Sequence, residues 1–183
     1  MSGRMLGTLA LLLLATVPLA AQDGRRGPPR HAGFWIGFGV GGGSNMWSGF
    51  DGIRAGGAGY LRLGGTINQQ LLLGGESLGW VRSENNTTVS YGNTTASVLF
   101  YPSLAGGLYL KSGLGFAVRQ AEVAVGGGTF TGSDAGLGAT LGVGYEFRLG
   151  NNFFVVPGFD VAMQVIDDDS GALLFFTVGV LWH

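Results

Sequence analysis

The side chains that could do chemistry are few in this sequence of 183 residues. There is no cysteine, and the two histidines are His31 and His183. The lack of cysteine excludes disulfides, thiol catalysis, acylation at cysteine and thiolate metal sites. A serine hydrolase needs a histidine beside its nucleophile, and a zinc site needs three or four clustered ligands. Because the two histidines are distant in the sequence, we expect no catalytic activity, no metal site and no cofactor.

Two other segments have motif-like spacing. The glycine-rich string at 37–43 matches the G-x-G-x-x-G phosphate-binding pattern, but no helix-forming sequence follows it. A phosphate loop needs that helix N-terminus, so we interpret the string as small residues of a strand. Three aspartates at 167–169 are similar to the start of a calcium loop but lack its alternating ligands and distant glutamate. We interpret them as a solvated turn, with loose contact to divalent ions as the alternative.

Glycine dominates the composition, with 37 residues of 183, where an average protein has about 7%. Glycine shows no Gly-X-Y period, and there are 5 prolines and 46% hydrophobic residues, so collagen and disordered linkers are excluded. Lys and Arg total 10 against 11 for Asp and Glu, which gives a net charge of -1. This balance provides no basic surface for nucleic acid, and we expect no nucleic-acid partner.

The first 21 residues have the layout of a secretory signal. Arg4 precedes an apolar run at 6–17, which is short for a membrane span, and the segment ends on small residues. We predict a signal peptide over 1–21 that is cleaved after Ala21, with an uncleaved anchor helix as the alternative. Residues 22–32 are rich in Gly, Pro and Arg, and we predict a flexible, solvated leader with nothing to bury.

From residue 33 onward, apolar residues recur with period two and never with helical spacing. In segment 134–149 every odd position is apolar or aromatic, and every even position is glycine, threonine or charged. Segments 53–67 and 108–119 also carry no ionisable residue on their apolar face. The alternation predicts eight strands, at 33–43, 53–67, 69–83, 87–101, 107–121, 133–149, 152–166 and 172–182.

The residue types on the two faces indicate which face is inside. The polar face is mostly glycine, which is too small for a solvated surface and suits the crowded interior of a narrow barrel. An arginine facing lipid would cost about 2–4 kcal/mol near the middle of a bilayer. We therefore predict an all-β fold, a transmembrane up-and-down antiparallel β-barrel of eight strands over 33–183, with its apolar face on lipid.

An even number of strands puts both ends of the barrel on one side of the membrane. If that side is the periplasm, residues 22–32 are a periplasmic leader. The connections at the opposite end are then the outer loops, and all four are short. The predicted outer loops are 44–52, 84–86, 122–132 and 167–171.

This register also assigns side chains to functional sets. Outward aromatic residues fall at the periplasmic ends of their strands and predict an aromatic girdle. They are Phe34, Phe100, Phe147, Phe153 and Trp182. Inward charged residues predict a lumen network of paired charges. They are Arg54, Arg62, Glu76, Arg82, Lys111, Arg119, Glu146, Arg148 and Asp160. We interpret this network as a structural plug, with a gated polar path as the alternative.

Large aromatic side chains also point inward in this register and fill the lumen. They are Trp35, Tyr60, Trp80, Tyr101, Tyr109, Phe154 and Phe175. Such side chains would also suit a passage for small apolar molecules.

With its signal, its eight strands and the string FFTVGVLWH at 175–183, the chain resembles the small outer-membrane β-barrel proteins of Gram-negative bacteria, the OmpX-like and OmpW-like group. The last strand is similar to the assembly signal of such barrels through Thr177, Gly179 and Trp182, although the chain ends on His183 instead of an aromatic residue. The resemblance implies periplasmic chaperones, insertion by the barrel-assembly machinery, and contact with outer-membrane lipids and lipopolysaccharide.

The resemblance does not imply one activity, since the relatives include scaffolds, adhesion-related proteins, narrow channels and lipid-modifying enzymes. We expect a monomeric, non-enzymatic protein of the bacterial outer membrane with a side-chain-filled lumen and a mainly structural or surface-interaction role. The alternative is a narrow OmpW-like channel for small molecules, including hydrophobic ones.

Overall fold

The computed structural model describes residues 30–46, 54–126 and 128–183. The predicted signal peptide and most of the predicted leader lie outside these ranges. No helix within them is long and apolar enough to cross a membrane. The strands of the described chain are β1 Phe34–Asn45, β2 Arg54–Asn68, β3 Leu71–Glu84, β4 Thr87–Phe100, β5 Leu108–Val125, β6 Gly128–Tyr145, β7 Phe147–Arg148, β8 Phe153–Ile166 and β9 Asp169–Trp182.

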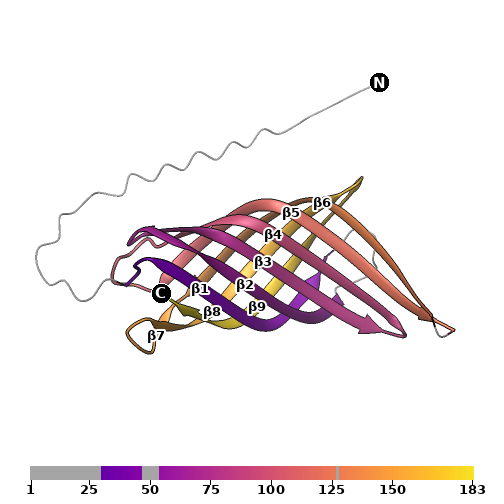
Figure 1. Ribbon diagram of the computed structural model, residues 1–183, viewed down its shortest axis with the longest axis horizontal. Helices are drawn as coiled ribbons and strands as arrows, with labels where there is room; N and C mark the ends of the chain where they lie inside the picture. The colour runs from indigo at the N-terminus through magenta and orange to yellow at the C-terminus, as the bar shows by residue number, and fades with distance from the viewer. Residues whose placement is uncertain (1–29, 47–53, 127) are drawn as a thin grey trace, which may run out of the picture.

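The strands form one closed antiparallel sheet (Figure 1). Neighbouring strands pair in sequence order, and pairing of β1 with β9 and of β6 with β8 completes the circle. The two-residue β7 follows β6 after an interruption at Glu146 and pairs with β8. The predicted strand at 133–149 is therefore two elements, and the fold is the predicted eight-stranded up-and-down barrel.

The two ends of the barrel differ. Phe34 begins β1 and Trp182 ends β9, so the first and last strands start and finish at one end. We call this the terminal end and the opposite one the hairpin end. Figure 1 shows the C-terminus beside the start of β1, while β5 and β6 reach furthest toward the hairpin end.

The hairpin-end connections are shorter than predicted. The loop predicted at 122–132 is wrong, because β5 and β6 continue to pair as far as Val125 and Gly128, and Gly126 turns with φ of 56°. Valines and threonines in this segment favour extended strands, which explains the longer hairpin. The loop predicted at 167–171 shrinks to a turn before Asp169, and the loop predicted at 84–86 to a turn at Asn85 and Asn86, both with positive φ. Most of the predicted 44–52 loop lies outside the described residues.

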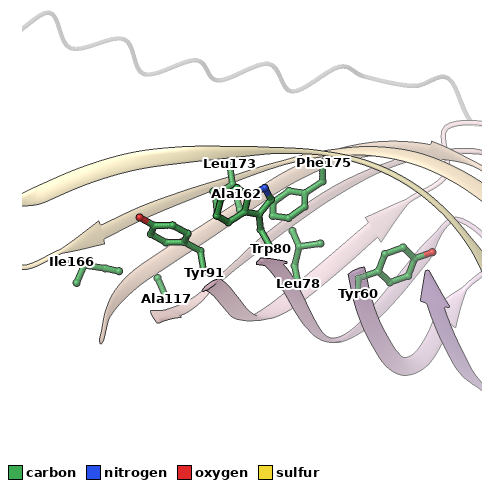
Figure 2. Close-up of a cluster of buried hydrophobic side chains, with 9 residues drawn as sticks. All are labelled: Tyr60, Leu78, Trp80, Tyr91, Ala117, Ala162, Ile166, Leu173 and Phe175. Carbon is green, nitrogen blue, oxygen red and sulfur yellow. The ribbon is translucent and has the colours of Figure 1, made fainter. Parts of the chain in front are cut away.

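The interior is filled by side chains, as predicted. All seven aromatic residues expected to point inward are buried. Two buried apolar clusters occupy different levels of the lumen. The cluster nearer the hairpin end is Tyr60, Leu78, Trp80, Tyr91, Ala117, Ala162, Ile166, Leu173 and Phe175. The cluster nearer the terminal end is Trp35, Leu72, Leu99, Tyr101, Tyr109, Phe154, Val156 and Leu181. Figure 2 shows Leu78 and Trp80 from β3 pointing toward Leu173 and Phe175 from β9 in the first cluster.

The outer wall is apolar. Leu114, Phe116, Leu137, Phe176 and other large hydrophobic residues are more than half exposed on it. Soluble monomers rarely expose apolar surface on this scale, whereas a lipid bilayer covers it on transmembrane barrels. The register of the strands therefore agrees with the prediction that the apolar face contacts lipid.

Glycines play different parts on the two walls. At inward Gly115, Gly136, Gly142 and Gly144, a Cβ atom would collide with the backbone or side chains of a neighbouring strand. At outward Gly79, the nearest atom to a Cβ is the backbone oxygen of Tyr91 at 3.9 Å. The inward glycines are therefore required by the packing of the lumen, and the outward one is not.

We expect Leu141→Arg to prevent insertion, because Leu141 is 52% exposed on the apolar wall. A charge there would cost about 2–4 kcal/mol near the bilayer midplane. Leu141→Ala serves as the control and should insert normally. The measurement is the shift in gel mobility between unheated and boiled samples after refolding into lipid vesicles. Normal insertion of Leu141→Arg would contradict the assigned register.

We expect Gly142→Ala to destabilise the barrel by about 1–3 kcal/mol, as overfilling a packed interior does. Gly79→Ala should have a neutral or slightly stabilising effect, because its methyl group has space. Urea unfolding in detergent, followed by tryptophan fluorescence, compares the two variants. Equal effects of the two substitutions would refute the different roles assigned to inward and outward glycines.

Candidate functional site

Four buried charged side chains meet at the centre of the lumen. Nζ of Lys111 lies 2.6 Å from both carboxylate oxygens of Glu76 and 2.8 Å from Oδ1 of Asp160. Nε of Arg62 lies 3.4 Å from Oε2 of Glu76. All four side chains are almost fully buried. This central quartet contains two positive and two negative groups, so its formal charge is zero.

Strand pairing explains how the quartet assembles. Arg62 and Glu76 are cross-strand partners on β2 and β3. Lys111 on β5 and Asp160 on β8 both pair with Gly142 of β6, which has no side chain to separate them. The sheet thus brings a lysine and an aspartate together across an intervening glycine.

Aromatic residues complete the surroundings of Arg62. Its guanidinium lies 3.8 Å from the centroid of the Tyr60 ring, and Nη1 donates a hydrogen bond to the Tyr109 hydroxyl at 3.0 Å. These contacts satisfy a buried cation that would be costly alone.

The quartet lies between the two apolar clusters. Along β3 the order is Leu72, Glu76 and then Trp80, and along β8 it is Phe154, Asp160 and then Ile166. The lumen therefore contains an apolar layer, a charged layer and a second apolar layer.

The other predicted lumen charges do not join the quartet. Arg82 pairs with Glu84 at 2.9 Å and Arg119 with Asp134 at 2.9 Å, both toward the hairpin end. Arg54 is exposed at the start of β2. Arg148 is exposed and donates to the backbone oxygens of Gly150 and Asn151.

A cavity of about 400 Å³, which we call the surface bowl, lies at the hairpin end of the barrel. Its lining residues include Arg54, Arg82, Trp80 and Tyr91.

Glu146, the remaining predicted lumen charge, belongs to a separate cluster at the terminal end. Its Oε2 lies 3.0 Å from Nε2 of His31, and its Oε1 accepts a hydrogen bond from the Tyr101 hydroxyl. The ring centroid of His183 lies 4.8 Å from that of His31. We call His31, Tyr101, Glu146 and His183 the mouth cluster.

The mouth cluster corrects two sequence predictions. The leader was expected to bury nothing, yet His31 is 1% exposed, and Arg30 donates to the backbone oxygen of Glu146 at 2.6 Å. The two histidines were expected to be distant, but closure of β1 against β9 brings them together. The predicted fold could have indicated this proximity, because in a closed barrel the residues that flank the first and last strands are neighbours.

Gln69, which the sequence analysis did not select, holds Arg30 and His31 in place. Its side-chain oxygen accepts hydrogen bonds from the backbone amides of Arg30 and His31 at 3.0 and 3.2 Å. Its amide donates to the backbone oxygen of His31, and its backbone oxygen lies 3.0 Å from Nδ1 of the same residue. No sequence pattern marks this residue, because a glutamine in a turn has no distinguishing spacing.

The structure also locates the predicted girdle and assembly residues. The five girdle aromatics are exposed on the outer wall at the terminal end, where Phe153 pairs with Trp182. In β9, Thr177 is buried, and a Cβ at Gly179 would collide with the Tyr60 hydroxyl. Contact of these residues with lipid and with assembly factors remains a prediction.

A groove lies on the outer wall toward the hairpin end. Gly59, Gly79 and Gly92 pair side by side across β2, β3 and β4 and face outward, since each precedes or follows a buried aromatic residue. The groove over these glycines has a volume of about 530 Å³.

We expect Glu76→Gln to destabilise the barrel by about 3–5 kcal/mol, because it leaves the buried Lys111 and Arg62 with Asp160 as the remaining carboxylate. Glu84→Gln is the matched control, since it breaks an exposed ion pair worth about 0–1 kcal/mol. Urea unfolding in detergent measures both. A Glu76→Gln effect no larger than that of Glu84→Gln would show that the quartet does not hold the lumen together.

No protein-family model matches the chain, and neither does any curated protein. Solved structures match at low identity. Neisserial surface protein A (NspA) is 17% identical over 82% of this chain and 97% of its own, with a TM-score of 0.62. Ail, the attachment invasion locus protein of Yersinia pestis, was solved with the heparin analogue sucrose octasulfate and is 16% identical over 82% of this chain and 99% of its own, with a TM-score of 0.62.

The N-terminal β-barrel domain of OprF from Pseudomonas aeruginosa is 11% identical, over 83% of this chain and 98% of that domain, with a TM-score of 0.51. At these sequence identities the similarity shows a shared fold and does not indicate a shared function. The chain has the fold of the small eight-stranded outer-membrane β-barrels.

Proposed function

We propose that the chain is an exported, monomeric, non-enzymatic protein of the bacterial outer membrane, with a filled lumen and a structural or surface-interaction role. The observation that carries the proposal is the continuous filling of the lumen. The two apolar clusters enclose the central quartet, and the mouth cluster covers the terminal end. An eight-stranded barrel has an interior just wide enough for side chains to fill, so stacked layers of side chains disfavour an aqueous path from one end to the other.

Export and membrane placement rest on the sequence and on the outer wall together. A signal-like segment at 1–21 would direct the chain across the inner membrane. The apolar wall would then face the lipids and lipopolysaccharide of the outer membrane, after insertion by the barrel-assembly machinery. A monomer is supported because a closed sheet has no free edge with which to pair another chain.

The hairpin end suggests the chemistry of a surface partner. Arg82 and Arg119 are held by carboxylates, and further acidic residues lie around them. Among the described residues of this end, the acidic ones are Glu84, Glu122, Asp134, Asp167, Asp168 and Asp169, against the basic Arg54, Arg82 and Arg119. This balance does not favour a sulfated saccharide such as the heparin analogue bound to Ail. We propose a neutral or cationic partner.

A second candidate function is lateral passage of small apolar molecules, and the groove over Gly59, Gly79 and Gly92 favours it. This groove lies on the lipid side of the wall, so a molecule could use it without crossing the filled lumen. It is the structural counterpart of the OmpW-like alternative considered from the sequence.

We expect the refolded protein to be electrically silent in planar bilayers, because the layers of the lumen exclude a continuous water column. Insertion is verified on the same preparation by heat-dependent gel mobility. Reproducible single-channel steps from verified, inserted protein would overturn the filled-lumen proposal.

Uptake of a fluorescent apolar solute into liposomes tests the second candidate. Absence of uptake by the wild type supports the structural role. Uptake that is lost in Gly79→Leu, which fills the groove, and retained in Gly65→Leu, an outward glycine with open space around it, supports lateral passage instead.

A further inference from the structure

We infer that His31, Glu146 and His183 of the mouth cluster form a zinc-binding site at the terminal end of the barrel. One ligand atom from each of the three side chains lies within 4.8 Å of the other two. Two histidines and a glutamate are a common zinc ligand set, which leaves a fourth position for water. Imidazole nitrogens favour zinc over calcium or magnesium, which prefer oxygen ligands alone. The site lies at the end of the barrel opposite the surface bowl and is independent of the proposed function.

The contacts of His31 leave either a proton or a metal ion to join its ring to Glu146. Nδ1 lies 3.0 Å from the backbone oxygen of Gln69, which only accepts, so Nδ1 carries a hydrogen. In the neutral ring, Nε2 then presents a lone pair to Oε2 of Glu146, 3.0 Å away. Two lone pairs repel each other unless a proton or a metal ion lies between them. The contact with a backbone oxygen is also how zinc-binding histidines are oriented.

Glu146 is prepared for the same role by Tyr101. The Tyr101 hydroxyl donates to Oε1, which orients the carboxylate and leaves Oε2 toward His31. The Tyr101 ring also packs against the His31 ring, with centroids 4.1 Å apart. In metal sites, residues that hydrogen-bond to the ligands in this way hold them in the orientation needed for binding.

His183 supplies the third ligand. Both of its ring nitrogens are buried and have no hydrogen-bond partner in the described part of the chain. Its backbone amide donates to the backbone oxygen of Asn152, and its ring packs edge-on against Phe154. A neutral imidazole offers one nitrogen lone pair, and since neither ring nitrogen of His183 is hydrogen-bonded within the described chain, the ring can direct that lone pair toward a metal ion.

Arg30 is the group that competes with a metal ion. Its Nε lies 3.6 Å from Oε2 of Glu146, and its Nη2 donates to the backbone oxygen of the same residue. If His31 carries the proton instead, the cluster is an ion-paired latch that needs no metal. The latch and the zinc site predict different responses to added zinc.

The test is a titration of the full chain, without a histidine tag, refolded in detergent and stripped with EDTA. We expect one zinc ion per chain in competition with a chromophoric chelator, and cobalt in its place should give the visible absorption of a site with nitrogen ligands. His31→Ala, His183→Ala and Glu146→Gln should abolish binding, and Tyr101→Phe should weaken it by about tenfold. Asp168→Asn, an exposed acid at the hairpin end, is the control and should bind normally.

A second measurement avoids the risk that a variant misfolds. The wild type contains 2 histidines, so zinc should shift the NMR signals of both rings together. Absence of zinc binding, unchanged histidine signals, or binding that survives all three ligand variants would overturn the zinc site. None of these results would alter the conductance or uptake measurements, so this inference and the proposed function fail separately.

Discussion

The width of an eight-stranded barrel governs the rest of this structure. Every inward side chain shares a space that is only a few side chains across, so each large or charged residue needs a small neighbour. Gly142 allows Lys111 and Asp160 to meet, and Gly144 leaves room for the Tyr109 hydroxyl. The glycine content that made the composition unusual is therefore in part the geometric requirement of a filled lumen.

The same constraint determines how charge is buried. An isolated ion in the middle of the lumen would be strongly destabilising, whereas a quartet of paired charges with no net charge can be accommodated. Apolar layers above and below keep the quartet away from water. Charges that lack this enclosure, such as Arg82 and Arg119, lie toward the end of the barrel and form exposed pairs.

Much of this could be predicted from the sequence, because period-two alternation identifies both the strands and the face that each side chain occupies. The inward positions of Trp35, Lys111 and Asp160 follow from that pattern. The partners within the quartet do not, since they depend on the stagger between strands, which alternation leaves open. The length of the β5–β6 hairpin was also missed, because the chain pairs through glycine-rich sequence that usually indicates a loop. The proximity of His31 to His183 depends on closure of the sheet, and no local sequence pattern indicates it.

The seam between β1 and β9 has a consequence for how the chain folds. The other pairs join strands that are consecutive in the chain or, for β6 and β8, separated by the two-residue β7. This seam joins Ile36 to Trp182 and so has the largest sequence separation in the sheet. Contacts of high sequence separation form slowly. At Gly41, a Cβ would collide with the backbone of β9, so the glycine-rich string at 37–43 makes a close junction between the two strands possible. The mouth cluster spans this junction and cannot assemble before it closes, which makes His31 and His183 a natural reporter of barrel closure.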